Sequence, residues 1–240
     1  IVAQAQKVIE QVDIIHQIAS QSDAQTNTPL KVGAIHTIAP YIFPSLIPAL
    51  KTTAPEMPLF IQDNFTQALT LKLQRGQLDA IFIALPYSEP GIVSKPLYEE
   101  SFVVLLPKSH PLAKKKALSA TDLKNENTLI LGEGHCFRDQ IIKTCPQCYN
   151  PSALQQTIEG TSLETLRHMV ASGMGITILP ATAANIRHYD HTLCIRPFSS
   201  KAPRRTIALA WRASFPRPKA IEAMIQALSR SKLSNICIIA

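Results

Sequence analysis

Residues 78–85 read Leu-Asp-Ala-Ile-Phe-Ile-Ala-Leu, an almost continuous apolar run in a chain that alternates short apolar segments with helical ones. A strand of this kind is buried on both faces, as in a parallel sheet covered by helices. Strands are also predicted at 30–35 and 59–62, with helices from about Pro40 and between residues 64 and 76, where Asn64 could cap the second helix. This order indicates right-handed crossovers and a mainly parallel sheet in an α/β fold.

The second half of the chain repeats the alternation and predicts a second α/β unit. Thr161 and Glu164 have the spacing of a capping box at the start of a helix that ends near Gly173. Residues 1–20 have the apolar spacing of an amphipathic helix, and the polar segment 20–29 reads as a linker. The remaining predicted elements are strands at 102–107, 128–131, 176–180 and 205–211 and a closing helix at 219–229.

Composition narrows the class of protein. The chain has 240 residues, 46% of them hydrophobic, and no apolar run of about 18 residues that could span a membrane, so we expect a cytoplasmic protein without membrane partners. Five cysteines in so long a chain favour reduced thiols over a secreted disulfide framework. The net charge is +7, but the runs Lys114–Lys116 and Arg204–Arg205 lack interleaved aromatics and are interpreted as solvated faces.

One cysteine stands among groups that would make it reactive. Cys136 lies between His135 and Phe137, two residues before Arg138, and nearby positive charge favours the thiolate that reacts with peroxide. The resulting sulfenic acid condenses with a nearby thiol, for which Cys145 is the nearest candidate. A buried, unreactive cysteine is the alternative, because cysteine is among the most commonly buried residues.

Other cysteine arrangements are weaker signals. The Cys145-Pro-Gln-Cys148 spacing is typical of disulfide oxidoreductases, but it stands past the middle of the chain rather than after a first strand. Zinc ligation by His135, Cys136, Cys145 and Cys148 would lack the usual two short ligand pairs, so no metal is predicted. Cys194 and Cys237 have apolar neighbours and are predicted to be packed. The sequence contains no glycine-rich phosphate-binding loop, so no nucleotide cofactor is predicted.

Two threonines follow predicted strands. Thr37 comes after the first strand and Thr66 after the second, and small ligands bind near the carboxyl ends of parallel strands. Each could instead only cap a helix or turn.

Taken together, the chain resembles the regulatory domain of the OxyR family, the hydrogen-peroxide-sensing branch of the LysR-type transcriptional regulators. The resemblance spans nearly the whole chain, and the segment around Cys136 distinguishes this branch from other LysR-type proteins. It rests on the segments 35–41, 134–140 with the nine-residue step to Cys145, 161–167, and 173–177 with Leu179 and Pro180.

The resemblance implies two Rossmann-like subdomains of periplasmic-binding-protein type joined by crossover strands, with a DNA-binding domain absent from this chain. The expected division is a linker helix and linker at 1–28, subdomain I at 29–100 plus 204–240, and subdomain II at 101–203, which carries the redox cysteines.

The same resemblance assigns roles to residues and partners. Cys136 would be the peroxidatic cysteine and Cys145 the resolving one, with Arg138 and Asp139 in the same catalytic segment. Thr37, Thr66 and His135 would hold peroxide. The implied partners are hydrogen peroxide, further copies of the chain in a homodimer or homotetramer, promoter DNA and RNA polymerase through the full-length protein, and glutaredoxin or thioredoxin as reductant.

The chain departs from the family at two positions. Thr157 stands where the family often has histidine, and Cys148 is an additional thiol that could compete for the sulfenic acid or offer a second exit for the disulfide. Two other functions stay open: a LysR-type domain that responds to an organic effector, and a thiol peroxidase or disulfide oxidoreductase.

Overall fold

The computed structural model describes residues 8, 12, 15, 25–146, 160–185, 191–199 and 202–239. The chain divides into two compact units, which are Ile1–Tyr98 with Ile207–Leu233 and Ile238–Ala240, and Glu99–Thr206 with Ser234–Cys237. Two long strands, β4 (Ile92–Pro107) and β8 (Arg204–Arg212), each contribute residues to both units.

In the first unit, the strands are arranged in the order β2-β1-β3-β8. Strand β1 (Leu30–Ile35) lies parallel to both β2 (Leu59–Asn64) and β3 (Ala80–Ala84), and β8 pairs antiparallel with β3. All five residues of β3 are buried, as its apolar run predicts, whereas the edge strand β2 has exposed residues.

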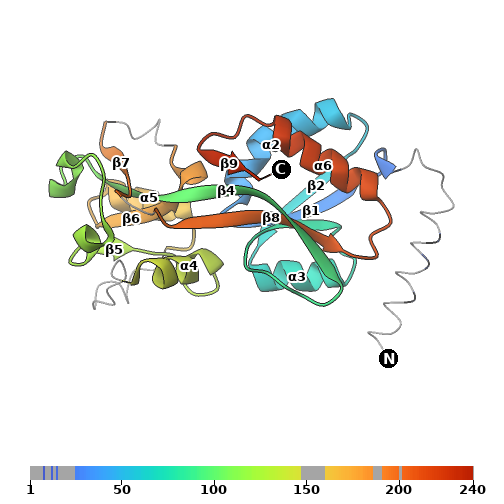
Figure 1. Cartoon of the computed structure of the whole chain (residues 1–240), viewed down its shortest axis with the longest axis horizontal. Coiled ribbons are helices and arrows are strands. Elements are labelled where there is room, and N and C mark those ends of the chain that lie inside the picture. Colours follow the sequence, from blue (N-terminus) through green and yellow to red (C-terminus); the bar gives the residue numbers. More distant parts are fainter. Residues whose placement is uncertain are drawn as a thin grey trace. The chain divides into compact units, whose positions relative to one another are not determined.

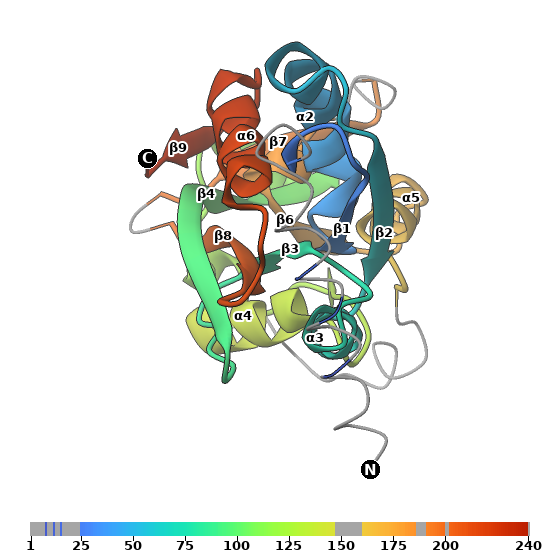
Figure 2. The ribbon, with the colours of Figure 1, turned by 90° about the vertical axis from the view of Figure 1, so that its right-hand side faces the viewer.

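Helices cover both faces of this sheet. Helices α2 (Ala39–Thr53) and α6 (Pro218–Arg230) lie together on one side and α3 (Thr66–Gln74) on the other (Figures 1 and 2). Helix α6 buries one stripe of side chains spaced three and four residues apart, which is the pattern of a helix packed on a core. The stripe consists of Ala220, Ile221, Ala223, Met224, Ala227 and Leu228.

The second unit has the strand order β7-β4-β6-β5. Strand β6 (Ile176–Pro180) is buried throughout, pairs parallel with β5 (Thr128–Leu129) and antiparallel with β4. Strand β7 (Leu193–Pro197) pairs with the other edge of β4. Helices α4 (Cys136–Thr144) and α5 (Leu163–Ala171) belong to this unit, and a last short strand, β9 (Ile236–Ile238), also pairs with β4.

Three expectations about the fold are wrong. The sheet is mixed rather than mainly parallel, because β4 and β8 run antiparallel to their neighbours β6 and β3. The N-cap of α5 is Ser162, whose hydroxyl accepts a hydrogen bond from the backbone N–H of Thr165, rather than Thr161. The N-cap of α3 is Phe65, and the Asn64 side chain accepts a bond from the backbone N–H of Phe65 instead of capping the helix.

The predicted linker helix at 1–20 lies mostly outside the described residues. Val8, Val12 and Ile15 are helical and exposed. Among the described parts of the chain, no helix is long and apolar enough to cross a membrane.

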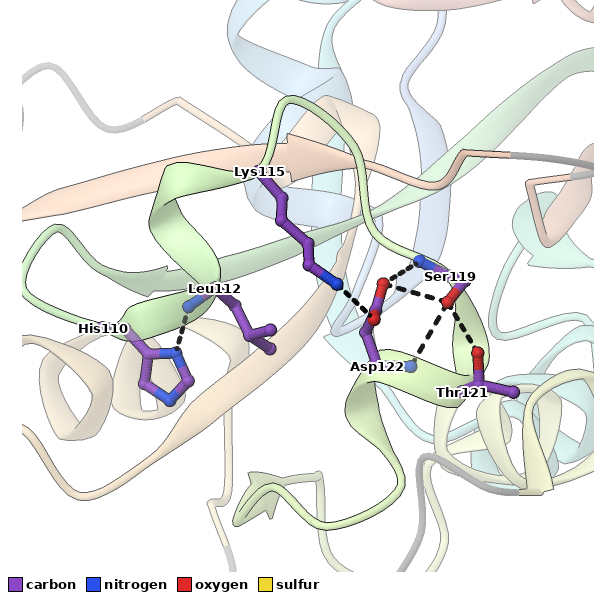
Figure 3. A network of polar contacts seen from close by, with 6 residues as sticks. All are labelled: His110, Leu112, Lys115, Ser119, Thr121 and Asp122. Carbon is purple, nitrogen blue, oxygen red and sulfur yellow. Dashed lines mark hydrogen bonds and ion pairs between the residues drawn. The ribbon is translucent and has the colours of Figure 1, made fainter.

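A polar cluster orders the connection between β4 and β5 (Figure 3). Two short 3₁₀ helices lie there, Pro111–Lys114 and Ala120–Leu123. The Asp122 carboxylate accepts hydrogen bonds from the Ser119 backbone N–H at 2.8 Å and from the Lys115 ammonium at 2.6 Å. The Ser119 hydroxyl in turn accepts from the Asp122 N–H, which completes a capping box.

These bonds stabilise the charged form of Asp122 and lower its pKa from 3.8 to about 2, with the Lys115 bond as the largest cause. We therefore expect the Asp122 contribution to stability to be complete above pH 3.8 and to be lost as the pH falls toward 2. An NMR titration of the Asp122 carboxyl carbon should show this low midpoint, and Lys115→Met should raise it. A midpoint near pH 4 in the unmodified chain would contradict the prediction.

Candidate thiol site

Helix α4 begins directly at the thiol that the sequence singles out. Gly134 has φ of 89°, in the left-handed region that favours glycine, and His135 then takes an extended conformation as the N-cap. Cys136 is the first residue of the helix and is half-buried. A thiolate at this place is stabilised by the backbone N–H groups and the dipole of the helix N-terminus.

The two cysteines of the predicted switch lie at opposite ends of α4. Cys145 is the C-cap residue, only 2% exposed, and its backbone N–H donates to the Ile141 carbonyl at 2.8 Å. Nine residues of helix rise by about 13 Å, whereas a disulfide needs Cα atoms within about 7 Å. Cys145 is disulfide-bonded in this structure and Cys136 is not.

The polar residues next to Cys136 have different surroundings. His135 is buried, with 6% of its surface exposed. The Arg138 guanidinium donates a hydrogen bond to the Leu131 carbonyl at 3.0 Å, which ties α4 to the segment that follows β5. Asp139 is exposed in the first turn of α4, where a carboxylate interacts favourably with the helix dipole.

Phe137 anchors the first turn of α4 in the core of the second unit. Its ring is fully buried and makes an edge-to-face contact with Phe102 of β4, with centroids 5.0 Å apart. The Arg205 guanidinium of β8 lies 5.0 Å from the same ring, a cation–π contact. The residue adjacent to Cys136 thus has a position set by β4 and β8.

Arg205 belongs to a buried ion pair that the sequence alone does not reveal. Its Nε donates to Glu100 of β4 at 2.8 Å, and both side chains are 0% exposed. The second oxygen of Glu100 accepts bonds from the Thr182 hydroxyl and backbone N–H. The expectation that Arg204–Arg205 forms a solvated face is therefore correct for Arg204, which is exposed, and wrong for Arg205. Residues alternate between the two faces of a strand, so neighbours can have opposite environments.

The threonines predicted to hold peroxide belong to the first unit. Thr37 follows β1 and is 2% exposed, and Thr66 is the first residue of α3, two residues after the end of β2. Both therefore follow the carboxyl ends of neighbouring parallel strands, as expected. Their grouping with His135 and Cys136 stays a prediction.

The predictions for the remaining cysteines are only partly confirmed. Cys194 is buried, as predicted, whereas Cys237 is exposed, so the prediction that it is packed is wrong. Its strand β9 is short and only partly covered. Cys148 and Thr157 lie outside the described residues. Within the part of the chain that the structure describes, no three His, Cys, Asp or Glu side chains are grouped to hold a metal ion.

Comparison with known proteins identifies the family. The model of the LysR substrate binding domain matches residues 23–232. The DNA-binding transcriptional dual regulator OxyR of Escherichia coli is 34% identical over 229 residues, which cover 95% of this chain and 74% of that protein. A full-length OxyR variant from Pseudomonas aeruginosa is 48% identical with a TM-score of 0.86, covering 97% of this chain and 75% of that one.

A third relative was solved with its ligand. A hydrogen-peroxide-bound OxyR mutant from Corynebacterium glutamicum is 30% identical, with a TM-score of 0.79 over 92% of this chain and 70% of that one. The chain belongs to the LysR-type transcription regulators and, among these, to the OxyR family. It has the periplasmic-binding-protein-like α/β fold of that family's regulatory domains, and the family is one of regulators rather than enzymes.

The buried ion pair gives a direct test of what supports α4. Glu100→Gln leaves the Arg205 charge buried without its partner, so we expect the free energy of unfolding to fall by about 3–5 kcal/mol. Glu99→Gln is the matched control, because Glu99 faces the exposed Arg204 at 3.6 Å and such pairs contribute about 0–1 kcal/mol. Urea unfolding of both variants measures the difference. Equal effects would contradict the assigned role.

Proposed function

We propose that this chain is the regulatory domain of a transcription factor that detects hydrogen peroxide through Cys136. Oxidation of Cys136 and formation of a Cys136–Cys145 disulfide would change subunit packing and promoter binding. The observation that carries the proposal is the placement of the two cysteines at opposite ends of α4 in a chain of the OxyR family.

In the first step, the Cys136 thiolate attacks one oxygen of hydrogen peroxide. The O–O bond breaks, the sulfur becomes a sulfenic acid, and the departing hydroxide takes a proton to form water. Thr37, Thr66 and His135 hold the peroxide, while Arg138 and Asp139 shape the segment around the thiolate. The peroxide-bound relative from Corynebacterium glutamicum supports this choice of ligand.

In the second step, the Cys145 thiol attacks the sulfenic sulfur, the disulfide forms and water leaves. The helix holds these residues about 13 Å apart, so the bond cannot form while α4 is intact. The helix must unwind for the bond to close. Oxidation of one sulfur is thereby converted into a rearrangement of residues 136–145, as a conformational switch requires.

The redox state of Cys145 limits this chemistry. Cys145 is disulfide-bonded in this structure, so that disulfide must be reduced before the Cys145 thiol can attack a sulfenic acid. We propose Cys148, three residues further on, as the extra thiol that competes with Cys145 for the sulfenic acid. Glutaredoxin or thioredoxin would be the reductant that returns the cysteines to thiols.

The output would be a change in assembly. Residues 29–100 plus 204–240 and residues 101–203 are proposed as the two regulatory subdomains, and residues 1–28 as the linker toward a DNA-binding domain. A cytoplasmic homodimer or homotetramer of the full-length protein would carry the signal to promoter DNA and RNA polymerase.

Disulfide mapping tests the switch. The chain is fully reduced, freed of reductant, treated with one equivalent of hydrogen peroxide and analysed by peptide mass spectrometry. We expect a rapid Cys136–Cys145 link, none in Cys136→Ser, and a higher yield in Cys148→Ser because the competing thiol is removed. An unreacted Cys136 would sink the proposal and favour a regulator of organic effectors, while continuous peroxide turnover with thioredoxin would favour a peroxidase.

Size-exclusion chromatography with light scattering tests the output. We expect the reduced chain to be dimeric or tetrameric and the peroxide-treated chain to elute differently, because the rearranged segment changes the surface available for packing. Cys136→Ser should elute like the reduced protein under both conditions. A strict monomer in both redox states would count against coupling through subunit packing.

A further inference from the structure

His36 and Asp63 form a hydrogen-bonded pair to which the proposed function gives no role. The His36 Nδ1–H donates to the Asp63 Oδ2 at 2.7 Å. His36 directly precedes Thr37, and Asp63 stands three residues before Thr66. The pair is therefore close in sequence to both threonines that the proposed function uses to hold peroxide.

The pair joins two strand ends just where their backbone ladder stops. The last paired residues of β1 and β2 are Ile35 and Asn64. Just beyond them, the bond from His36 to Asp63 joins the residues that follow β1 to the end of β2. A hydrogen bond to a charged group is shorter and stronger than one between neutral groups.

The imidazole also contacts the start of α3. The rings of His36 and Phe65 meet edge to face, with centroids 5.1 Å apart. Phe65 is the N-cap of α3, and Thr66 is the first residue of that helix. One side chain thus contacts the end of β2 and the N-cap of α3 while its own backbone leads into Thr37.

We propose that His36 and Asp63 are positioning residues for peroxide, which fix the Thr37 hydroxyl relative to that of Thr66. The inference rests on the proposed function, in which those two hydroxyls hold the substrate. Hydrogen peroxide is small and has only two hydroxyl groups for hydrogen bonding, so its orientation in a site depends on hydrogen-bond donors and acceptors whose positions are fixed. Misplacing such a group by about 1 Å can cost up to a hundredfold in rate.

The effect of the His36–Asp63 pair on the stability of the fold can be separated from its proposed effect on the position of the threonine hydroxyls. The side chains of His36 and Asp63 are 30% and 54% exposed, and exposed pairs contribute little to folding. Loss of the pair should therefore leave the melting temperature almost unchanged. A purely structural role would predict no effect on the peroxide reaction either.

The test compares variants that differ in one feature each. His36→Phe keeps an aromatic ring against Phe65 and removes the hydrogen bond, whereas His36→Asn keeps a donor for Asp63. We expect the second-order rate constant for oxidation of Cys136 by hydrogen peroxide to fall about tenfold in His36→Phe and to stay within about twofold in His36→Asn. Asp63→Ala, alone or with His36→Phe, should match His36→Phe, because the two residues act as one unit.

Two controls assign the effect to peroxide. Alkylation of Cys136 by iodoacetamide needs the thiolate but no bound peroxide, so its rate should be the same in all variants. His110→Phe breaks another histidine–carboxylate pair, with Glu126 at 3.2 Å, and should leave the peroxide rate unchanged.

The outcomes are distinct. An unchanged peroxide rate in His36→Phe would overturn the inference and leave the proposed function intact. Equal losses in the peroxide and iodoacetamide rates would also overturn it, because the pair would then act on the thiolate or the fold. A Cys136 that resists peroxide in the unmodified chain would refute the proposed function itself.

Discussion

The Glu100–Arg205 ion pair is the interaction on which the thiol site depends. A charge removed from water is stable only with a partner, so this pair links the neighbouring strands β4 and β8. The same two side chains extend the constraint: Glu100 accepts bonds from Thr182, and Arg205 lies against Phe137 in the first turn of α4. Three segments far apart in sequence thereby determine where Cys136 stands.

Helix α4 is well suited to a switch because its stability depends on packing against the rest of the unit more than on interactions within the helix. It has nine residues and no side-chain cap at its N-terminus, and helices this short are marginal in water. Packing of Phe137 and Ile141 therefore supplies most of what keeps it folded. Under the proposed function, a disulfide between its ends would compete directly with that packing, since the bond and the helix exclude each other.

Much of the fold follows from local pattern, and the errors are equally instructive. The predicted strands at 30–35 and 176–180 match β1 and β6, because apolar runs of that length bounded by turn residues define buried strands. Both predicted helix caps were displaced by one residue, since a cap depends on the backbone angles of the residue as well as its side chain. The antiparallel direction of β4 and β8 was not predicted, because the pattern of apolar residues in a strand is the same whether the strand runs parallel or antiparallel to its neighbour.

The sequence by itself determined the α/β alternation, the OxyR resemblance and the reactive-thiol candidate, because these depend on residues close together in the chain. Only the tertiary structure decided which polar side chains meet. His36 and Asp63 are 27 residues apart, and Glu100 and Arg205 are 105 apart. Adjacent arginines in one strand proved to be one exposed and one buried, because burial is created when strands and helices pack and not by the order of residues.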